Sequence, residues 1–229
     1  SDTVAVTPLV TLAGPTEIAG GLIDNNTVWL KSRSPYNISA NIKVKKDIEL
    51  LLLAGTEVAF ANANVGITLA GSMLALGQEN MTVKISAFGA DDTNSNNYSN
   101  AIIYEQGNNT PSVFNHTEFN YIKAYYDYEN SYDRQNYIVP LQLNDGSLNI
   151  FSNGGNSDFY IQSANNTDIT LSGWGNGGNS NSAKINSANN ITATSADFDA
   201  IGGMPSTNYL NGLFIRNISN SIFNRISLY

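Results

Sequence analysis

The tetrapeptide Ser163-Ala164-Asn165-Asn166 recurs 24 positions later as Ser187-Ala188-Asn189-Asn190. In the same register Ile161 matches Ile185, and a looser third copy, 214–220, follows after an insertion. A period of this length is one coil of a solenoid, in which each coil buries its apolar face only against its neighbours. The repeat therefore predicts a parallel β-helix with isoleucines facing inward and asparagines at the turns.

The N-terminal half of the chain carries the alternation of apolar and polar residues that is typical of short β-strands. Glycine or asparagine separates these segments, and no helix-length amphipathic segment interrupts them. We therefore expect an all-β protein, with strands within 42–52, 58–60, 67–69, 73–76 and 83–85.

Four landmarks in this half resemble the opening coils of right-handed parallel β-helix surface proteins. They are Thr27-Val28-Trp29, Ser34-Pro35-Tyr36, the turn Ala54-Gly55 and the coil 66–77. In that family a "W…SPY" entry leads into a strand, a Pro-Gly turn and a "G-x-L-x-A-x-G" coil; here Ala54-Gly55 stands where Pro-Gly is usual. The resemblance covers about residues 25–90. It implies a fold and no activity, because this solenoid carries lyases, hydrolases, tailspikes, adhesins and appendage proteins alike.

These observations together predict a single-stranded right-handed parallel β-helix, or β-solenoid, of about eight to ten coils with roughly 22–25 residues per coil. Residues 1–24 are expected to form an extended N-terminal arm or cap. Residues 25–229 are expected to form the β-helix domain, with a Tyr-rich loop at 121–137.

Composition excludes several classes of function. The net charge of -8 and the pI near 4.4 argue against a nucleic-acid partner, because affinity for phosphates depends on clustered Lys and Arg. The absence of cysteine excludes disulfides, thiolate metal sites and Cys nucleophiles. The longest apolar run, Leu50 to Ala54, is far too short to span a membrane.

The sequence offers weak signals for catalysis. Asn166-Thr167-Asp168 resembles the Asn-x-Asp of polygalacturonase-type hydrolases, in which paired carboxylates activate water and protonate the leaving oxygen. The partners are missing, because Asp91-Asp92 lies upstream and the sole histidine, His116, does not lie between glycines. Arg216 and Arg225 lack the neighbouring carboxylates of a pectate lyase. We therefore expect no catalytic residues and no enzyme activity.

A metal site has one weak candidate. Asp92, Asn94 and Asn96 space oxygen ligands two apart, as calcium loops begin, but Asn97 replaces the loop glycine and no bidentate Glu follows at the expected distance. A solvated turn explains the segment better. We expect no cofactor, with calcium as the only candidate.

Aromatic residues mark the candidate binding surface. The segment 121–137 breaks the repeat and is rich in Tyr, which offers wide apolar area and a hydroxyl at low entropy cost. It forms either a projecting loop for sugars or protein partners, or a loop folded back over the solenoid. The candidate binding or interface residues are Tyr125, Tyr126, Tyr128, Tyr132 and Trp174.

Both ends of the chain carry apolar residues suited to assembly, because the open coils of a solenoid expose strand edges and apolar faces. An apolar extended segment can also add a strand to a neighbouring chain. The candidate assembly residues are Val4, Val6, Leu9, Val10 and Leu12 at one end, and Ile222, Phe223, Ile226 and Leu228 at the other.

Glycosylation sequons weakly favour an extracellular or cell-surface location. They occur at Asn25, Asn37, Asn80, Asn97, Asn108, Asn115, Asn165, Asn190 and Asn217. We expect a non-enzymatic structural or adhesive surface protein that self-assembles into a filament or array through its solenoid ends. The alternatives are a polysaccharide-active β-helix enzyme, either a lyase or a glycoside hydrolase, and a virion tailspike or fibre segment on the virion surface. The expected partners are other copies of the chain, and glycans are a second candidate.

Overall fold

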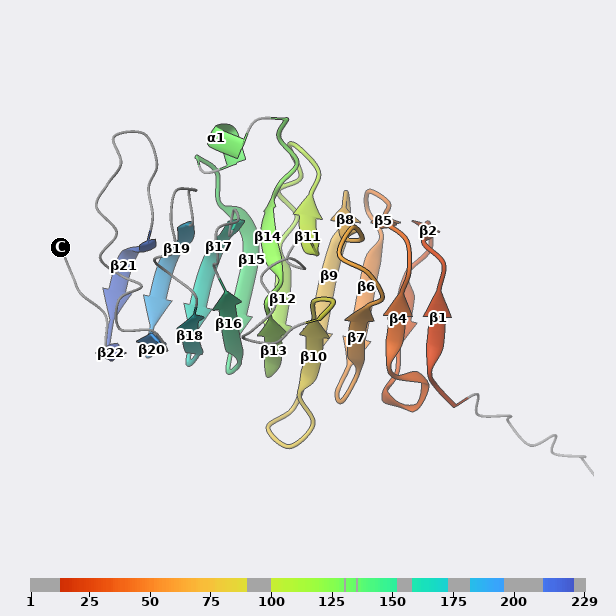
Figure 1. Ribbon diagram of the computed structural model, residues 1–229, viewed down its shortest axis with the longest axis horizontal. Coiled ribbons are helices and arrows are strands. Elements are labelled where there is room, and N and C mark those ends of the chain that lie inside the picture. The colour runs from red at the N-terminus through yellow and green to blue at the C-terminus, as the bar shows by residue number, and fades with distance from the viewer. Residues whose placement is uncertain are drawn as a thin grey trace, which may run out of the picture.

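The structure is a computed structural model that describes residues 13–89, 100–129, 131–134, 136–151, 158–172, 182–195 and 212–224. Short strands wind in successive coils along one long axis, and the short helix α1 (Ser131–Arg134) projects from the side (Figure 1). The 3-10 turn η1 (Lys31–Arg33) lies at a corner of the first coil.

Each coil places its strands in rows that run the length of the solenoid. The first row is one sheet of nine strands: β1 (Thr16–Ile18), β4 (Tyr36–Ile38), β7 (Glu57–Phe60), β10 (Val83–Ser86), β13 (Thr117–Asn120), β16 (Ser147–Phe151), β18 (Asp168–Ser172), β20 (Thr192–Ser195) and β22 (Ile222–Asn224). All pairs of named strands are parallel. The predicted all-β parallel β-helix is thereby confirmed.

The other strands form a second and a third row. The second row contains β2 (Gly21–Ile23), β5 (Ile42–Val44), β8 (Ile67–Leu69), β11 (Ala101–Tyr104) and β14 (Lys123–Tyr126). The third row contains β3 (Thr27–Trp29), β6 (Glu49–Leu53), β9 (Ser72–Leu76), β12 (Ser112–Asn115) and β15 (Val139–Asn144).

The cross-section of the solenoid changes after the fifth coil. The long strand β17 (Asp158–Asn165) pairs with both β14 and β15, through Ala124 with Phe159 and Val139 with Ile161. The later strands β19 (Ser182–Asn189) and β21 (Gly212–Ser219) stack below it. We call β17, β19 and β21 the fused row. Among the described strands, the first five coils therefore have three each and the following coils have two.

Inward-facing side chains stack in columns, and these columns are the core. One column runs through Tyr36, Val58, Ile85, Phe119, Leu148 and Ile169, all of which are buried. Truncating such a side chain to alanine typically costs about 2–5 kcal/mol of stability, because a cavity forms where a coil above and a coil below both lose contacts.

Asparagines form a second kind of column at the corner that leads into the first row. Asn144 Nδ2 donates to Asn115 Oδ1 at 3.0 Å, and Asn165 Nδ2 donates to Asn144 Oδ1 at 2.9 Å. The residue that follows adopts a positive φ in five successive coils: His116 (43°), Asp145 (52°), Asn166 (47°), Asn190 (53°) and Asn220 (49°). Asn, Asp and His tolerate this left-handed conformation better than other residues, which explains the motif.

The predicted repeat register is confirmed. Ser163 lies beside Ser187, and Ser187 lies beside Asn217 of the looser third copy. The expected N-terminal boundary was wrong, because β1 and β2 already pair within the solenoid. Gly20 and Gly21, with φ of 83° and 114°, form the corner at which β1 ends and β2 begins.

The expected Tyr-rich loop at 121–137 was also wrong in its first part. Strand β14 (Lys123–Tyr126) is a regular member of the second row, and residues after Tyr126 make the excursion that carries α1. The inward side chain of Ala124 continues the core, which the run of tyrosines conceals in the sequence.

The asparagine column predicts a measurable contribution to stability. Asn144→Ala removes one hydrogen bond on each side, and we expect a loss of about 1–3 kcal/mol in the free energy of unfolding in urea. Asn80→Ala, at an exposed position, is the control and should change that value by less than about 0.5 kcal/mol. Equal values for both variants would contradict the prediction.

Candidate binding and assembly surfaces

The Asn-x-Asp tripeptide lies at a corner of the solenoid. Asn166 occupies the left-handed turn and donates to Asp145 Oδ1 at 2.8 Å, whereas Thr167 is buried. Asp168 is exposed at the start of β18, where its neighbours on the adjoining strands are Ser147 and Thr192. No second carboxylate lies beside Asp168 in these two register positions, so paired-carboxylate chemistry finds no support there.

His116 occupies the same turn two coils before Asn166, with φ of 43°. Its backbone N–H donates to Asn144 O at 2.9 Å, and its carbonyl accepts from Val83. In the described ranges, no group of three or more His, Cys, Asp or Glu side chains is placed to hold a metal ion. Asp92, Asn94 and Asn96, the calcium candidates, lie outside the described residues.

The tyrosines of the binding prediction pack against the solenoid. Tyr125 and Tyr126 are both buried, and Tyr125 joins Ala101 and Tyr160 in a small apolar cluster. The Arg134 guanidinium, carried by the excursion, lies 4.5 Å from the centroid of the Tyr125 ring. This arrangement favours the alternative of a segment folded back over the solenoid.

A group of rings surrounds Tyr126 at this surface. The Tyr128 and Tyr137 rings stack at 4.8 Å, and each meets the Tyr126 ring edge-on. The Tyr126 hydroxyl donates to Asn108 O at 2.9 Å. Only Tyr137 of these three is strongly exposed, at 48%, so it is the described ring best placed for a ligand.

Two of the proposed binding residues are not placed. Tyr132 lies within α1, but the structure does not describe its side chain, and Trp174 lies outside the described residues. Their roles remain predictions.

The ring of Tyr104 meets the ring of Tyr126 edge-on, with their centroids 6.1 Å apart. The Tyr104 hydroxyl is fully buried and makes no hydrogen bond of good geometry to any described residue. The nearby Ser112 hydroxyl lowers the pKa of Tyr104. Burial is the larger effect and raises the pKa of Tyr104 far above its usual value. Burial, and to a smaller degree the neighbouring Tyr128, also raises the pKa of Tyr126.

We predict that the substitution of Tyr by Phe has opposite effects on stability at positions 126 and 104. Tyr126→Phe should cost about 1 kcal/mol of unfolding free energy because the bond to Asn108 is lost. Tyr104→Phe should be neutral or stabilise by up to about 2 kcal/mol because it removes a poorly satisfied buried hydroxyl. Urea denaturation of both variants measures the difference, and a larger loss for Tyr104→Phe would overturn this assignment.

Alkaline pH supplies a second measurement on the same pair. The unfolded chain ionises its tyrosines near pH 10, whereas the folded chain keeps Tyr104 and Tyr126 neutral to higher pH. A raised folded pKa gives stability that is fully present below pH 10 and is lost as the pH rises above it. This loss should be shallower in Tyr104→Phe than in the wild type.

Sequence reasoning missed an aliphatic surface on the third row, which we call the leucine face. Its outward side chains are Val28 and Leu30 in the first coil, Leu51 and Leu53 on β6, Leu74 and Leu76 on β9, and Val113 on β12. The inward residues Leu50 and Leu52 of β6 lie in the core. Strands β6 and β9 are therefore aliphatic on both faces.

The same columns change character further along the solenoid. Below Val113 the outward column continues through Gln142, Ser163, Ser187 and Asn217, all of them polar. Parallel strands that are apolar on both faces normally belong to sheets covered on both sides. The contrast within a single row shows that the leucine face is a local feature of the first coils and not a general property of this solenoid.

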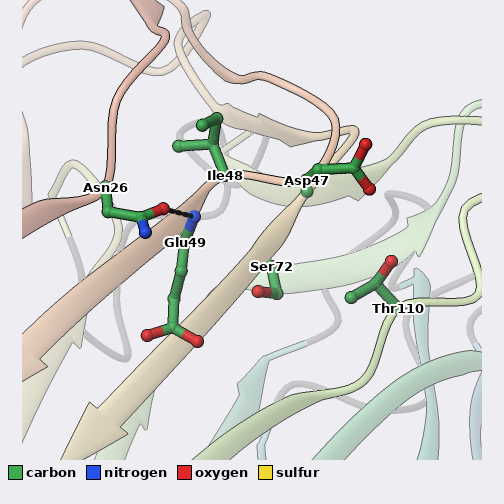
Figure 2. A pocket seen from close by; sticks show the side chains of 7 residues that line it. Asn26, Asp47, Ile48, Glu49, Ser72 and Thr110 are labelled. Atoms are coloured by element: carbon green, nitrogen blue, oxygen red, sulfur yellow. Dashed lines mark hydrogen bonds between the residues drawn. The ribbon is translucent and has the colours of Figure 1, made fainter.

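A polar pocket borders the leucine face where its strands begin (Figure 2). Its lining comes from the corners of four successive coils, and its volume is about 270 Å³. The Asn26 amide oxygen accepts a hydrogen bond from the Glu49 backbone N–H at 3.0 Å, which fixes one wall. The lining residues are Asn26, Asp47, Ile48, Glu49, Gly71, Ser72 and Thr110. A polar rim beside an apolar floor is the usual anatomy of a protein-binding surface.

The run Leu50-Leu51-Leu52-Leu53 carried the signal for this surface, because a strand with one solvated face would alternate with polar residues. We expect Leu51→Asn to change the unfolding free energy by less than about 1 kcal/mol, since the side chain points outward. Leu52→Asn, its inward neighbour, should cost more than about 3 kcal/mol.

Retention on a phenyl matrix separates the surface role from the structural one. Leu51→Asn combined with Leu74→Asn should elute clearly earlier than the wild type, whereas Asn80→Ala should elute with it. Unchanged retention of the double variant would show that the leucine face is not accessible.

The two ends of the described solenoid differ in how well their core is covered. In the first coil, Trp29 is only 4% exposed and stacks on Tyr36 with ring centroids 4.5 Å apart. In the last described coil, Ile218 continues the inward column of Ala164 and Ala188, yet it is 50% exposed. The core column is thus open at the C-terminal coil among the described residues.

The other assembly candidates are only partly placed. Phe223 packs partly buried against the core, and Ile222 points outward and is 59% exposed. Val4, Val6, Leu9, Val10, Leu12, Ile226 and Leu228 lie outside the described residues.

The sequons are unequal in accessibility. The asparagines at 25, 80, 190 and 217 are exposed, and those at 37, 115 and 165 are partly buried. Asn108 is buried, and its amide group donates to both Leu69 O and Gly71 O, so the folded chain does not present it for modification. Asn97 lies outside the described residues.

Comparison with known proteins gives no relative: no family model, no curated protein and no solved structure matches this chain. Within the described part of the chain, no helix has the length and apolar character needed to cross a membrane.

Proposed function

We propose that this protein is a non-enzymatic structural or adhesive protein of an extracellular surface, and that it assembles with other copies of itself through the ends of its solenoid. The observation that supports this most directly is the open core column at Ile218. An isoleucine at a position that is buried in the preceding coils gains stability when another chain covers it.

The backbone at the same end supports the proposal. In the described residues, β21 and β22 each pair with another strand on one side only. Free strand edges are templates for pairing with another chain. Apolar side chains and unpaired edges at one place favour a specific contact between strands.

The leucine face supports the adhesive part of the proposal. It gives the side of the solenoid an apolar surface, separate from the ends, on which a protein partner can pack. The resemblance of residues 25–90 to β-helix surface proteins and the exposed sequons support the extracellular location.

Two isoleucines of the last coil offer a matched test. Ile218 faces the core column and Ile222 faces outward, although both are about half exposed. We expect Ile218→Asn to weaken self-association at least tenfold, because the covered surface becomes polar, while Ile222→Asn has a much smaller effect.

Sedimentation velocity over a wide concentration range measures this association, and circular dichroism checks that each variant folds. A wild-type chain that stays monomeric at high concentration would refute the proposal. If both variants weaken self-association equally, the contact does not involve the core column.

A further inference from the structure

The polar pocket beside the leucine face carries negative charge that no described basic side chain neutralises. Asp47 and Glu49 line the pocket, and neither carboxylate forms an ion pair with a described residue. The basic residues nearest to them in sequence, Lys45 and Lys46, are exposed and do not line the pocket. A concave site lined by charge of one sign attracts a group of the opposite sign.

A buried hydroxyl points to a ligand at the same place. Ser72 is only 9% exposed, and its side chain makes no hydrogen bond to a described residue. Figure 2 shows the Ser72 hydroxyl on the pocket wall, between Glu49 and Thr110. A buried polar group without a partner costs free energy, so a donor that enters the pocket gains by satisfying this hydroxyl.

The arrangement of these acceptors suits an organic cation. Figure 2 shows the carboxylates of Asp47 and Glu49 directed away from each other, so they do not converge on one point as the oxygen ligands of a metal ion do. Acceptors that are spread over a pocket suit a group with several N–H donors. The guanidinium of arginine presents five such donors in a planar fork, and the ammonium of lysine presents three.

The leucine face continues directly from this pocket. Two neighbouring strands present the same order of outward side chains, which is one polar residue at the pocket and then two leucines. These residues are Glu49, Leu51 and Leu53 on β6, and Ser72, Leu74 and Leu76 on β9. A partner that covers the leucines therefore also reaches the pocket.

The spacing of these positions matches an α-helix that lies along the strands. Alternate residues of a strand are about 6.6 Å apart, and residues i and i+4 of a helix are about 6 Å apart along its axis. Helices are also the usual cover of parallel strands that are apolar on both faces. A helix with a basic residue at i and aliphatic residues at i+4 and i+8 places its basic side chain over the pocket and its aliphatic side chains over the two leucine positions.

We infer that the leucine face and the polar pocket form one docking site for an amphipathic helix of a partner protein, and that an arginine or lysine of this helix enters the pocket. This inference rests on the adhesive part of the proposed function and adds the chemistry of the partner. Arginine is enriched among the residues that contribute most to binding at protein interfaces, and charge complementarity with the two carboxylates selects it here.

Two fluorescently labelled peptides test the inference by anisotropy. Both are helical peptides with leucines at i+4 and i+8, and they differ only at position i, which is Arg in one and Glu in the other. We expect the wild-type chain to bind the Arg peptide about tenfold more tightly than the Glu peptide. Asp47→Asn combined with Glu49→Gln should remove most of this preference. Glu57→Gln, which changes an exposed carboxylate on β7, is the matched control and should preserve it.

Ser72→Ala separates binding from structure. It should weaken binding of the Arg peptide about fivefold and leave the unfolding free energy unchanged, because the Ser72 hydroxyl has no described partner to lose. Leu51→Asn combined with Leu74→Asn should weaken binding of both peptides, since both use the leucine face.

Equal binding of the two peptides to the wild-type chain, or binding of neither, would overturn the inference. Weaker self-association of the Asp47 and Glu49 double variant would also overturn it, because a second copy would then be the occupant. Sedimentation of the wild-type chain tests the proposed assembly separately. A monomeric chain that still prefers the Arg peptide refutes that assembly and supports the docking site.

Discussion

The chemistry that a strand position tolerates in this solenoid depends on the residues that stack on it in the neighbouring coils. Parallel strands stand about 4.8 Å apart, so neighbouring coils must place side chains of compatible chemistry in the same column. The column of Tyr36, Val58 and Ile85 remains apolar for this reason. The ladder of Asn115, Asn144 and Asn165 remains polar for the same reason, since Asn144 donates to Asn115 and Asn165 donates to Asn144.

This dependence explains which features could be predicted from the sequence. The register of Ser163 beside Ser187 follows directly from the repeated tetrapeptide, because residues in one column are selected by the same environment. The left-handed turns at Asn166 and Asn190 follow from the same motif. Where the columns carry a recognisable motif, the sequence predicts the fold to the residue.

Features that depend on the outer surface were harder to predict. Periodicity finds the inward leucines Leu50 and Leu52 but does not say that the outward Leu51 lacks a cover. Strand β14 was not predicted, because its tyrosines are typical of a loop or binding segment and the repeat is weak in this part of the sequence. The same limit hid the fused row, because the pairing of β17 with both β14 and β15 joins strands that are separated in sequence by residues 127–138.

The change from three strands per coil to two has a consequence for how the chain meets its own copies. A solenoid of uniform cross-section presents matching edges at both ends, so nothing in its geometry stops it from stacking without limit. Here the first coil ends in the edges of three strands, β1, β2 and β3, whereas the last described coils end in the edges of β21 and β22. The fused row still turns a corner within each strand, because Ile215 and Ile218 both lie in inward columns while the two residues between them are exposed. The two described ends therefore differ in how their strands are divided, and the change begins where β17 joins β14 and β15, the two strands that the connection after Tyr126 separates.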